Sequence, residues 1–325
     1  MDTILEIKDL QVEFQSDGRT VRAVNGVHLR LGEKETLGLV GETGAGKTTT
    51  ALSIMQLISS PPGKITSGEI LFEGDDLLKK SVKEMRKIRG NKISMIFQDP
   101  MTALNPVLTV SDQISEVIRN HQKCSRSQAL RQALNMMQMV GIPAERSKEY
   151  PHQFSGGMKQ RIVIAIALAC NPRLLIADEP TTALDVTIQA QVLRMMKKMR
   201  DQFSTSMLLI THDLGVVAEV CDSVAIMYAG EIVEYGTLAQ IFENPLHPYT
   251  KGLFDSLPSL EDDAERLRPI KGLMPDPTNL PSGCKFHDRC PFCTEKCTVE
   301  QPERTEVEPN HLVQCWLVKK GAGNE

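Results

Sequence analysis

The stretch that most limits how this chain can fold is Gly-Glu-Thr-Gly-Ala-Gly-Lys-Thr at residues 41–48. It fits G-x-x-x-x-G-K-[ST], a loop whose backbone N–H groups wrap around nucleotide phosphates. The apolar run 35–40 before it is typical of a strand, and the run 49–55 after it is typical of a helix. Glycine lets the chain turn tightly between the two, and the N-terminus of a helix attracts anions. The sequence therefore predicts a bound nucleoside triphosphate between a strand and a helix.

Two side chains of this loop have distinct predicted tasks. Lys47 is expected to contact the β- and γ-phosphates, and the Thr48 hydroxyl to ligate Mg²⁺. The predicted ATP-binding residues are the whole loop with the position after it: Gly41, Glu42, Thr43, Gly44, Ala45, Gly46, Lys47, Thr48 and Thr49.

The length and charge of the chain narrow its class further. A chain of 325 residues exceeds the usual single domain, so a main domain with a smaller addition is expected. A net charge of −4 provides no basic field, and nucleic acid is not an expected partner. The N-terminus does not resemble a signal peptide, and the longest apolar run, 162–170, is shorter than the roughly 20 residues that cross a bilayer. We therefore expect a cytosolic chain. In that compartment its eight cysteines are expected to be metal ligands or buried thiols in preference to disulfides.

The apolar pattern predicts an α/β core. Residues 173–177 and 206–210 are short all-apolar runs, as expected for strands buried on both faces of a parallel sheet. Between them, apolar residues recur at helical spacing from 192 to 203. Further segments are predicted as strands at 4–14, 21–31, 68–72 and 92–97, as mainly helical at 110–150, and as a hairpin at 223–228 and 231–235.

Two carboxylates follow the buried strand at 174–177. An acid at the end of a strand beside a phosphate loop can hold Mg²⁺, and an acid one residue further on can polarise an attacking water. Asp178 is therefore assigned to the metal and Glu179 to the general base.

A third motif precedes an apolar helical run. Ser155 is a suitable N-cap, and Gly156 and Gly157 allow a phosphate to approach the helix start. Together the three motifs resemble those of ATP-binding cassette (ABC) ATPases, whose signature reads close to Leu-Ser-Gly-Gly-Gln. Phe154 and Met158 replace the leucine and the glutamine here.

The resemblance covers about 240 residues and implies a RecA-like core, an antiparallel β subdomain and a helical signature subdomain. It also implies roles for single residues. Gln98 matches the glutamine that ligates Mg²⁺ and senses the membrane partner, and His212 matches the histidine at the γ-phosphate. Asp185, in Ala183-Leu184-Asp185, matches the loop that crosses the dimer interface. The family's usual aromatic residue for stacking on adenine is missing, and Arg22 is an alternative.

In this family the site is shared between two ATPase subunits, and the nucleotide held by one is capped by the signature of the other. The signature residues assigned to this trans-acting surface are Ser155, Gly156, Gly157 and Gln160.

From about residue 240 the chain becomes rich in proline and then in cysteine, and we predict two domains, 1–240 and 241–325. Four cysteines with the spacing C-x5-C-x6-C-x17-C are candidate metal ligands: Cys284, Cys290, Cys297 and Cys315. Four thiolates suit Zn²⁺ or an iron–sulfur cluster, and spacing alone does not choose between them. Cys293 is an alternative ligand, and His287 and His311 lie nearby in the sequence.

This second half resembles the C-terminal region of ATPase subunits of oligopeptide and dipeptide importers. That resemblance implies a [4Fe-4S] cluster on the four cysteines. We expect the cluster to be structural, because a short proline-rich segment has little core of its own. It also implies an ATPase that drives uptake of di- and oligopeptides from the cytoplasmic face of the inner membrane. The implied partners are a second ATPase subunit, two transmembrane permeases and, indirectly, an extracytoplasmic binding protein. A related importer for nickel, glutathione or opines, or a soluble ABC ATPase outside transport, are the alternatives.

Overall fold

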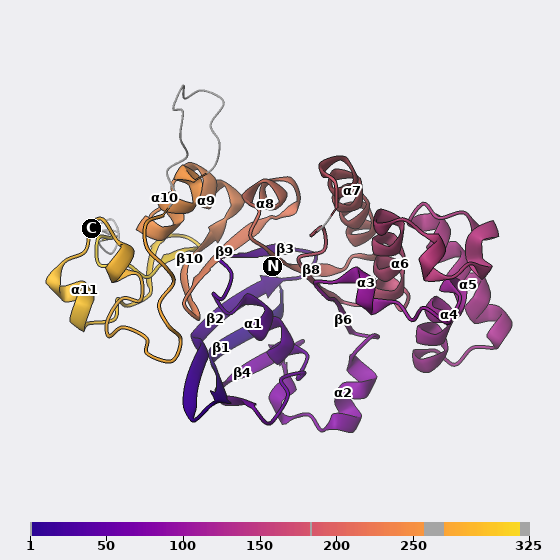
Figure 1. The fold of residues 1–325 in the computed structure, drawn as a ribbon, viewed down its shortest axis with the longest axis horizontal. Helices are drawn as coiled ribbons and strands as arrows, with labels where there is room; N and C mark the ends of the chain where they lie inside the picture. The colour runs from indigo at the N-terminus through magenta and orange to yellow at the C-terminus, as the bar shows by residue number, and fades with distance from the viewer. Residues whose placement is uncertain (1, 183, 257–269, 319–325) are drawn as a thin grey trace. The chain divides into compact units, whose positions relative to one another are not determined.

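The computed structural model describes residues 2–182, 184–256 and 270–318 (Figure 1). The chain forms two compact units, each assembled from separate segments. The first unit comprises Met1–Ile4, Leu31–Thr36 and Asp76–Ile210, and the second comprises Leu5–Arg30, Leu37–Asp75 and Thr211–Glu325.

The first unit contains the predicted buried strands. β7 (Leu174–Asp178) pairs in parallel with β6 (Ile93–Ile96) on one side and β8 (Ser206–Thr211) on the other. Every residue of β7 and β8 is buried, which explains their continuous apolar sequence. Helix α7 (Val186–Phe203) connects β7 to β8, so the predicted strand–helix–strand order is confirmed.

Helices make up the rest of this unit. Residues 110–150, predicted as mainly helical, form α4 (Val110–His121) and α5 (Arg126–Met139). Short 3₁₀ turns and then α6 (Gly156–Leu168) follow α5 in the chain. The four-residue α3 (Pro100–Ala103) precedes them. Helix α2 (Val82–Ile88) was not expected from the apolar pattern, although its capping box of Ser81 and Glu84 is a readable start signal.

The second unit begins with an antiparallel sheet in the order β2-β1-β4-β5, formed by β1 (Thr3–Ser16), β2 (Arg19–Gly32), β4 (Gly63–Phe72) and β5 (Asp75–Asp76). A tight turn joins β1 to β2. Asp17 and Gly18 both have positive φ, 49° and 73°, as a tight two-residue hairpin requires.

A further group of strands in this unit carries the phosphate loop. β3 (Thr36–Val40) leads into the loop and α1 (Lys47–Ile54), and pairs in parallel with β9 (Ser223–Tyr228). β9 and β10 (Glu231–Thr237) form the predicted hairpin, and α8 (Leu214–Val220) precedes it.

The C-terminal region, residues 241–325, is more closely built into this unit than its composition indicated. Two short strands, β11 (Thr305–Glu308) and β12 (His311–Val313), extend the same sheet, because β12 pairs with β10. The region's helices are α9 (Leu238–Glu243), which spans the predicted boundary, α10 (Pro248–Asp255) and α11 (Glu295–Val299). The compact units therefore do not divide near residue 240. Across the described residues, no helix combines the length and apolarity needed to span a membrane.

One buried carboxylate fixes the C-terminal region to β10. Glu234, only 1% exposed, accepts hydrogen bonds from the backbone N–H groups of Leu246 and His247 at 2.8 and 2.9 Å. The carboxylate also contacts His311 of β12, whose Nε2 lies 2.9 Å from Glu234 Oε1. Burial raises the pKa of Glu234, but its hydrogen bonds together hold that pKa below the ordinary value.

The pKa of a second acid of β10, Glu231, is shifted in the opposite direction. Burial raises the pKa of Glu231 from 4.5 to about 7, although Lys285 and a hydrogen bond from Gln301 oppose the shift. An acid whose folded-state pKa is raised stabilises the fold below its unfolded pKa. That contribution is lost as the pH rises through the folded value.

We therefore expect Glu231→Gln to become more stable relative to the wild type between pH 5 and pH 8, by up to about 3 kcal/mol. The physical reason is that wild-type Glu231 must ionise in a buried position at the higher pH. Urea unfolding of both proteins at the two pH values measures the difference, with the exposed Glu69→Gln as control. A stability difference that does not change with pH would contradict the expectation.

Candidate nucleotide-binding site

The phosphate loop requires glycine at two positions because backbone atoms crowd it. A Cβ at Gly41 would lie 2.2 Å from the carbonyl oxygen of Met227, and one at Gly46 would lie 2.5 Å from that of Ala23. Gly46, the N-cap of α1, also has a φ of 104°, which favours glycine. The loop is therefore seated directly on the backbones of β2 and β9.

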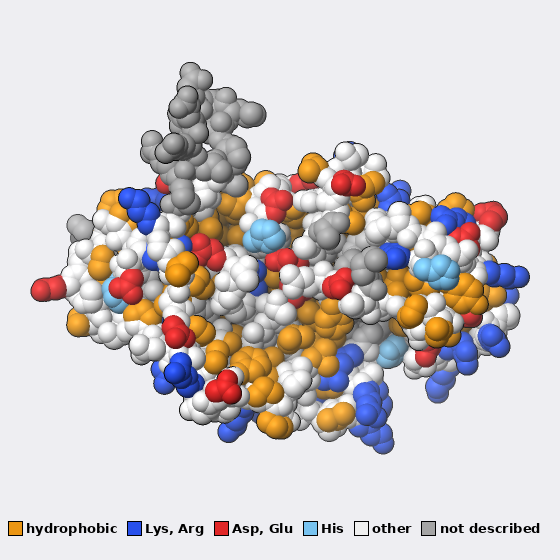
Figure 2. All heavy atoms as spheres, in the orientation of Figure 1, with side chains coloured by type: hydrophobic (Ala, Val, Ile, Leu, Met, Phe, Trp, Pro, Cys, Tyr) orange, Lys and Arg blue, Asp and Glu red, His pale blue; other side chains and the backbone are white. Residues whose placement is uncertain are grey.

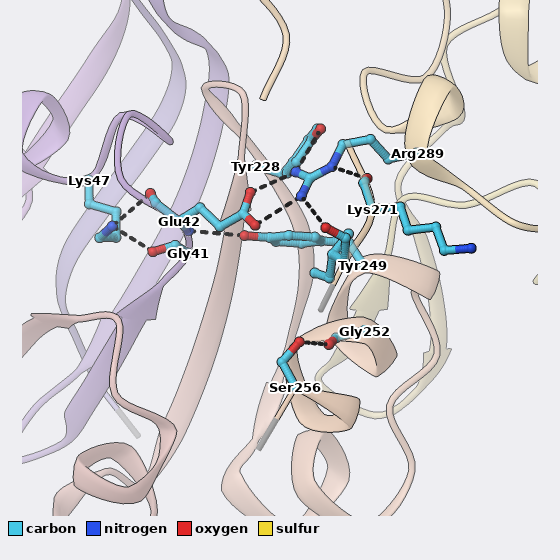
Figure 3. Close-up of polar contacts among 10 residues, drawn as sticks. Gly41, Glu42, Lys47, Tyr228, Tyr249, Gly252, Ser256, Lys271 and Arg289 are labelled. Atoms are coloured by element: carbon cyan, nitrogen blue, oxygen red, sulfur yellow. Dashed lines mark hydrogen bonds and ion pairs between the residues drawn. The ribbon is translucent and has the colours of Figure 1, made fainter. Parts of the chain in front are cut away.

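The side chain of Lys47 binds back to the start of the phosphate loop. Its side chain is buried, and Nζ donates hydrogen bonds to the carbonyl oxygens of Gly41 at 2.6 Å and Glu42 at 3.0 Å (Figure 3). Thr43, Gly44 and Thr48 remain exposed. The predicted order of strand, loop and helix is confirmed, and the exposed side of the loop is open to an anion at the start of α1.

A cavity of about 620 Å³ lies along the strand that supports this loop. It is lined by residues of β2 and of the C-terminal region: Arg19, Thr20, Arg22, Asp276, Thr278, Asn279 and Leu280. The backbone N–H of Arg22 donates to the carbonyl of Pro277 at 2.9 Å, and the next residue, Ala23, contacts the loop at Gly46. Arg22 is the residue that the sequence offers as an alternative for stacking on adenine. The C-terminal residues of this cavity could not be predicted, because no sequence pattern links positions so far apart in the chain.

In the first unit the structure brings Gln98 and Glu179 together. Glu179 Oε2 accepts hydrogen bonds from Gln98 Nε2 at 3.0 Å and from Thr182 Oγ1 at 2.9 Å. Glu179 has a φ of 46°, a strained conformation that often marks functional sites. Asp178 before it is buried at the end of β7.

The signature serine caps a helix as predicted. Ser155 Oγ accepts the backbone N–H of Met158 at 3.4 Å, and Ser155 and Gly156 are exposed at the start of α6. The first turn of α6 contains no acid, so its N-terminus remains attractive to an anion. Gln160, which was grouped with these residues, is instead fully buried, so its side chain does not belong to this exposed surface.

Both departures from the usual signature contact one side chain. The guanidinium of Arg146 lies 4.3 Å from the ring centre of Phe154, and its Nη1 lies 3.4 Å from Met158 Sδ. Arg146 also bonds the carbonyl oxygen of Gln153 at 3.0 Å and the carboxylate of Glu149. The substituted residues therefore pack as a group that holds the start of α6.

The remaining predicted residues lie at strand and helix ends. His212 is exposed and directly follows β8, and Asp185 is exposed at the N-cap of α7. Ala183 lies outside the described residues.

The four candidate cysteines influence one another. Burial raises the pKa of Cys284 to about 12, and charges on Cys315, Cys297 and Cys290 add to the effect. Burial and neighbouring thiols likewise raise the pKa of Cys290 and Cys315. Nevertheless, within the described residues no group of three or more His, Cys, Asp or Glu side chains is arranged to hold a metal ion.

The alternative ligands are placed differently. Cys293 is exposed, and its Sγ lies 3.6 Å from the carbonyl oxygen of Thr294. His311 contacts buried Glu234, and His287 contacts the carbonyl oxygen of Cys284 at 2.8 Å.

Comparison with known proteins identifies the class. Residues 24–182 match the family described as ABC transporter, and residues 233–297 match the one described as oligopeptide/dipeptide transporter, C-terminal region. A solved structure of the ATP-binding cassette MJ0796, dimeric and bound to ADP and Pi, aligns with a TM-score of 0.65 and 27% identity, over 72% of this chain and 98% of that one. Another, cbiO1 from Clostridium perfringens, part of the ABC transporter complex cbiONQ, aligns with a TM-score of 0.65 and 26% identity, over 75% of this chain and 92% of that one. Fold and site together define an ABC-type ATPase.

Relatives that align with almost the whole chain identify its family more specifically. The chain is 53% identical to the dipeptide transport ATP-binding protein DppD of Bacillus subtilis (strain 168), over 98% of this chain and 95% of that protein. It is 50% identical to the oligopeptide transport ATP-binding protein AppD of the same organism, over 98% of both. The chain therefore belongs to the family of oligopeptide and dipeptide transport ATP-binding proteins, which confirms the resemblance seen in its sequence.

The crowding around Gly46 gives a testable expectation. Gly46→Ala should weaken ATP binding at least about tenfold, because the added Cβ must displace the loop from Ala23. Gly74→Ala is the matched control: its φ of 82° is also positive, but no atom lies within 4 Å of the added Cβ. Calorimetric titration with Mg·ATP measures both, and equal affinities in the two variants would contradict this account.

Proposed function

We propose that this chain is the ATP-hydrolysing subunit of an ABC importer that energises uptake of di- and oligopeptides. The observation that carries the proposal is the strand-end acid Glu179, which has a φ of 46° and accepts side-chain hydrogen bonds from Gln98 and Thr182. The names of the full-length relatives support the peptide cargo.

The proposed chemistry is positioning and charge stabilisation. Lys47 and the backbone of residues 41–49 hold the phosphates, and Glu179 orients and polarises the attacking water, with His212 at the γ-phosphate. Thr48, Gln98 and Asp178 supply oxygen atoms, the donors that Mg²⁺ prefers, so the residues fit that ion. Bound Mg²⁺ would neutralise phosphate charge. The cavity beside Arg22, at the start of β2, would accommodate the adenine ring of the nucleotide.

The second subunit enters through the exposed signature. Ser155, Gly156 and Gly157 at the start of α6 would cap the nucleotide of a partner ATPase, and Asp185 would lie at the interface loop. The exposure of Ser155 and Gly156 supports this role, and buried Gln160 is left out of it. The partner is a second copy or a paralogue.

The importer would also include two transmembrane permeases and an extracytoplasmic binding protein, with this chain on the cytoplasmic face of the inner membrane. Acidic and basic side chains are mixed over the visible surface, in keeping with protein partners and no role for nucleic acid (Figure 2). An importer for nickel, glutathione or opines is the second candidate, because the ATPase does not contact the cargo. We retain 1–240 as the ATPase domain and 241–325 as the importer-specific domain.

A [4Fe-4S] cluster on Cys284, Cys290, Cys297 and Cys315 belongs to the same proposal. Together with burial, the charges of Cys290, Cys297 and Cys315 raise the pKa of Cys284, which supports a shared thiolate site, since a bound cation would offset the repulsion between thiolates. Zn²⁺ is the alternative occupant.

Glu179→Gln should lower ATP turnover at least about 100-fold while leaving ATP binding intact, because the amide keeps the shape of the acid but cannot accept a proton. Phosphate release by the assembled transporter and calorimetric ATP binding measure the two effects. Glu69→Gln, an exposed acid of β4, is the control and should hydrolyse normally. Unimpaired turnover in Glu179→Gln would remove the general base from the mechanism.

Metal analysis of protein purified without oxygen tests the cysteine site. We expect about four iron atoms and four acid-labile sulfides per chain, lost together in Cys284→Ser. One equivalent of zinc without sulfide would replace the cluster with Zn²⁺, and Cys293→Ser shows whether the fifth thiol takes part.

A further inference from the structure

An arginine of the C-terminal region reaches the phosphate loop. Arg289 donates from Nη1 to Glu42 Oε2 at 2.7 Å and from Nη2 to Glu42 Oε1 at 3.0 Å (Figure 3). This is a two-pronged ion pair, the geometry in which arginine binds a carboxylate most strongly. Arg289 is 5% exposed and Glu42 30% exposed, so water screens the pair only in part.

The guanidinium is fixed on its other sides. Nε donates to the carbonyl of Lys271 at 3.0 Å, and Nη2 to that of Ile270 at 3.4 Å. The ring centres of Tyr228 and Phe286 lie 5.7 and 5.9 Å from the guanidinium carbon. Arg289 is therefore a rigid partner, and little further ordering is needed to hold Glu42.

The backbone of Glu42 is held at the same place. Its N–H donates to the hydroxyl of Tyr249 at 3.0 Å, and its carbonyl accepts from Lys47 Nζ at 3.0 Å and from the N–H of Ala45 at 3.1 Å. Tyr249 is fully buried, and its ring centre lies 4.6 Å from that of Tyr228. One residue thus links the phosphate lysine to two side chains of the C-terminal region.

The negative charge of Glu42 makes its ion pair with Arg289 important for ATP binding. A carboxylate inside a phosphate-binding loop repels a triphosphate, and the repulsion is strongest where water is excluded. Pairing with Arg289 offsets that charge, and the carboxylate points toward Arg289 of the C-terminal region (Figure 3).

We propose that Arg289 and Tyr249 are positioning residues of the nucleotide site, which neutralise Glu42 and fix the start of the phosphate loop. The C-terminal region then contributes to ATP affinity, in addition to any part in cluster binding. The inference rests on the proposed function, in which this loop binds ATP.

The test is a charge-rescue series in the full-length chain, with Mg·ATP affinity measured by calorimetry. Arg289→Gln should weaken binding about tenfold, because it leaves the Glu42 charge unpaired. Adding Glu42→Gln to that variant should restore most of the affinity, since the repelling charge is then gone. Lys296→Met, which removes a cation stacked 3.3 Å from Trp316 in the same region, should bind ATP normally.

A purely structural role for Arg289 predicts a different pattern. Adding Glu42→Gln would then leave the ATP affinity low. A double variant that binds ATP as weakly as Arg289→Gln alone therefore overturns the proposal. Unchanged affinity in a folded Arg289→Gln overturns it as well. Tyr249→Phe, which deletes one hydroxyl, provides a second test that preserves packing: about threefold weaker binding is expected, and wild-type binding contradicts the role of Tyr249.

Two controls separate this inference from the proposed function. Thermal unfolding without nucleotide checks that each variant is folded before its affinity is compared. If the wild-type chain itself does not bind Mg·ATP, the proposed function fails. If the wild type binds and the variants match it, only the role of Arg289 and Tyr249 fails.

Discussion

The close seating of the phosphate loop on two strand backbones is the constraint on which the nucleotide site depends. Gly41 and Gly46 contact carbonyl oxygens of Met227 and Ala23 at distances that leave no room for a side chain. Lys47 donates to carbonyl oxygens of the loop itself, and these hydrogen bonds orient its ammonium group. Preorganisation of this kind lowers the cost of ordering a charged site around its ligand.

Local chemistry explains why so much of the fold could be predicted from sequence. The all-apolar strands β7 and β8, the Asp17-Gly18 turn and the glycine-rich loop each depend on residues adjacent in the chain. The signals for such elements are short and repeat in many proteins, and family motifs at fixed spacing add the rest. The same reasoning missed helix α2, whose seven residues carry a cap but little apolar periodicity.

Contacts between distant residues could not be predicted. Arg289 and Glu42 are separated by 247 positions, and Glu234 and His311 by 77, so neither pair leaves a local pattern. The proline and cysteine content predicted a second domain at 241–325, but composition does not report that β12 of this region would pair with β10. Likewise, the buried position of Gln160 depends on packing around α6 and not on its neighbours in sequence.

The division of the chain into interleaved segments has a consequence for its synthesis. The second unit takes its first strands from residues 5–75 and its last from beyond residue 300. A ribosome therefore releases the segment bearing the loop long before the strands and the arginine that complete its surroundings. Until β11 and β12 have been synthesised, the nascent chain holds an unpaired sheet edge, the kind of surface on which chaperones act. Completion of this unit therefore waits for strands that are made long after the phosphate loop.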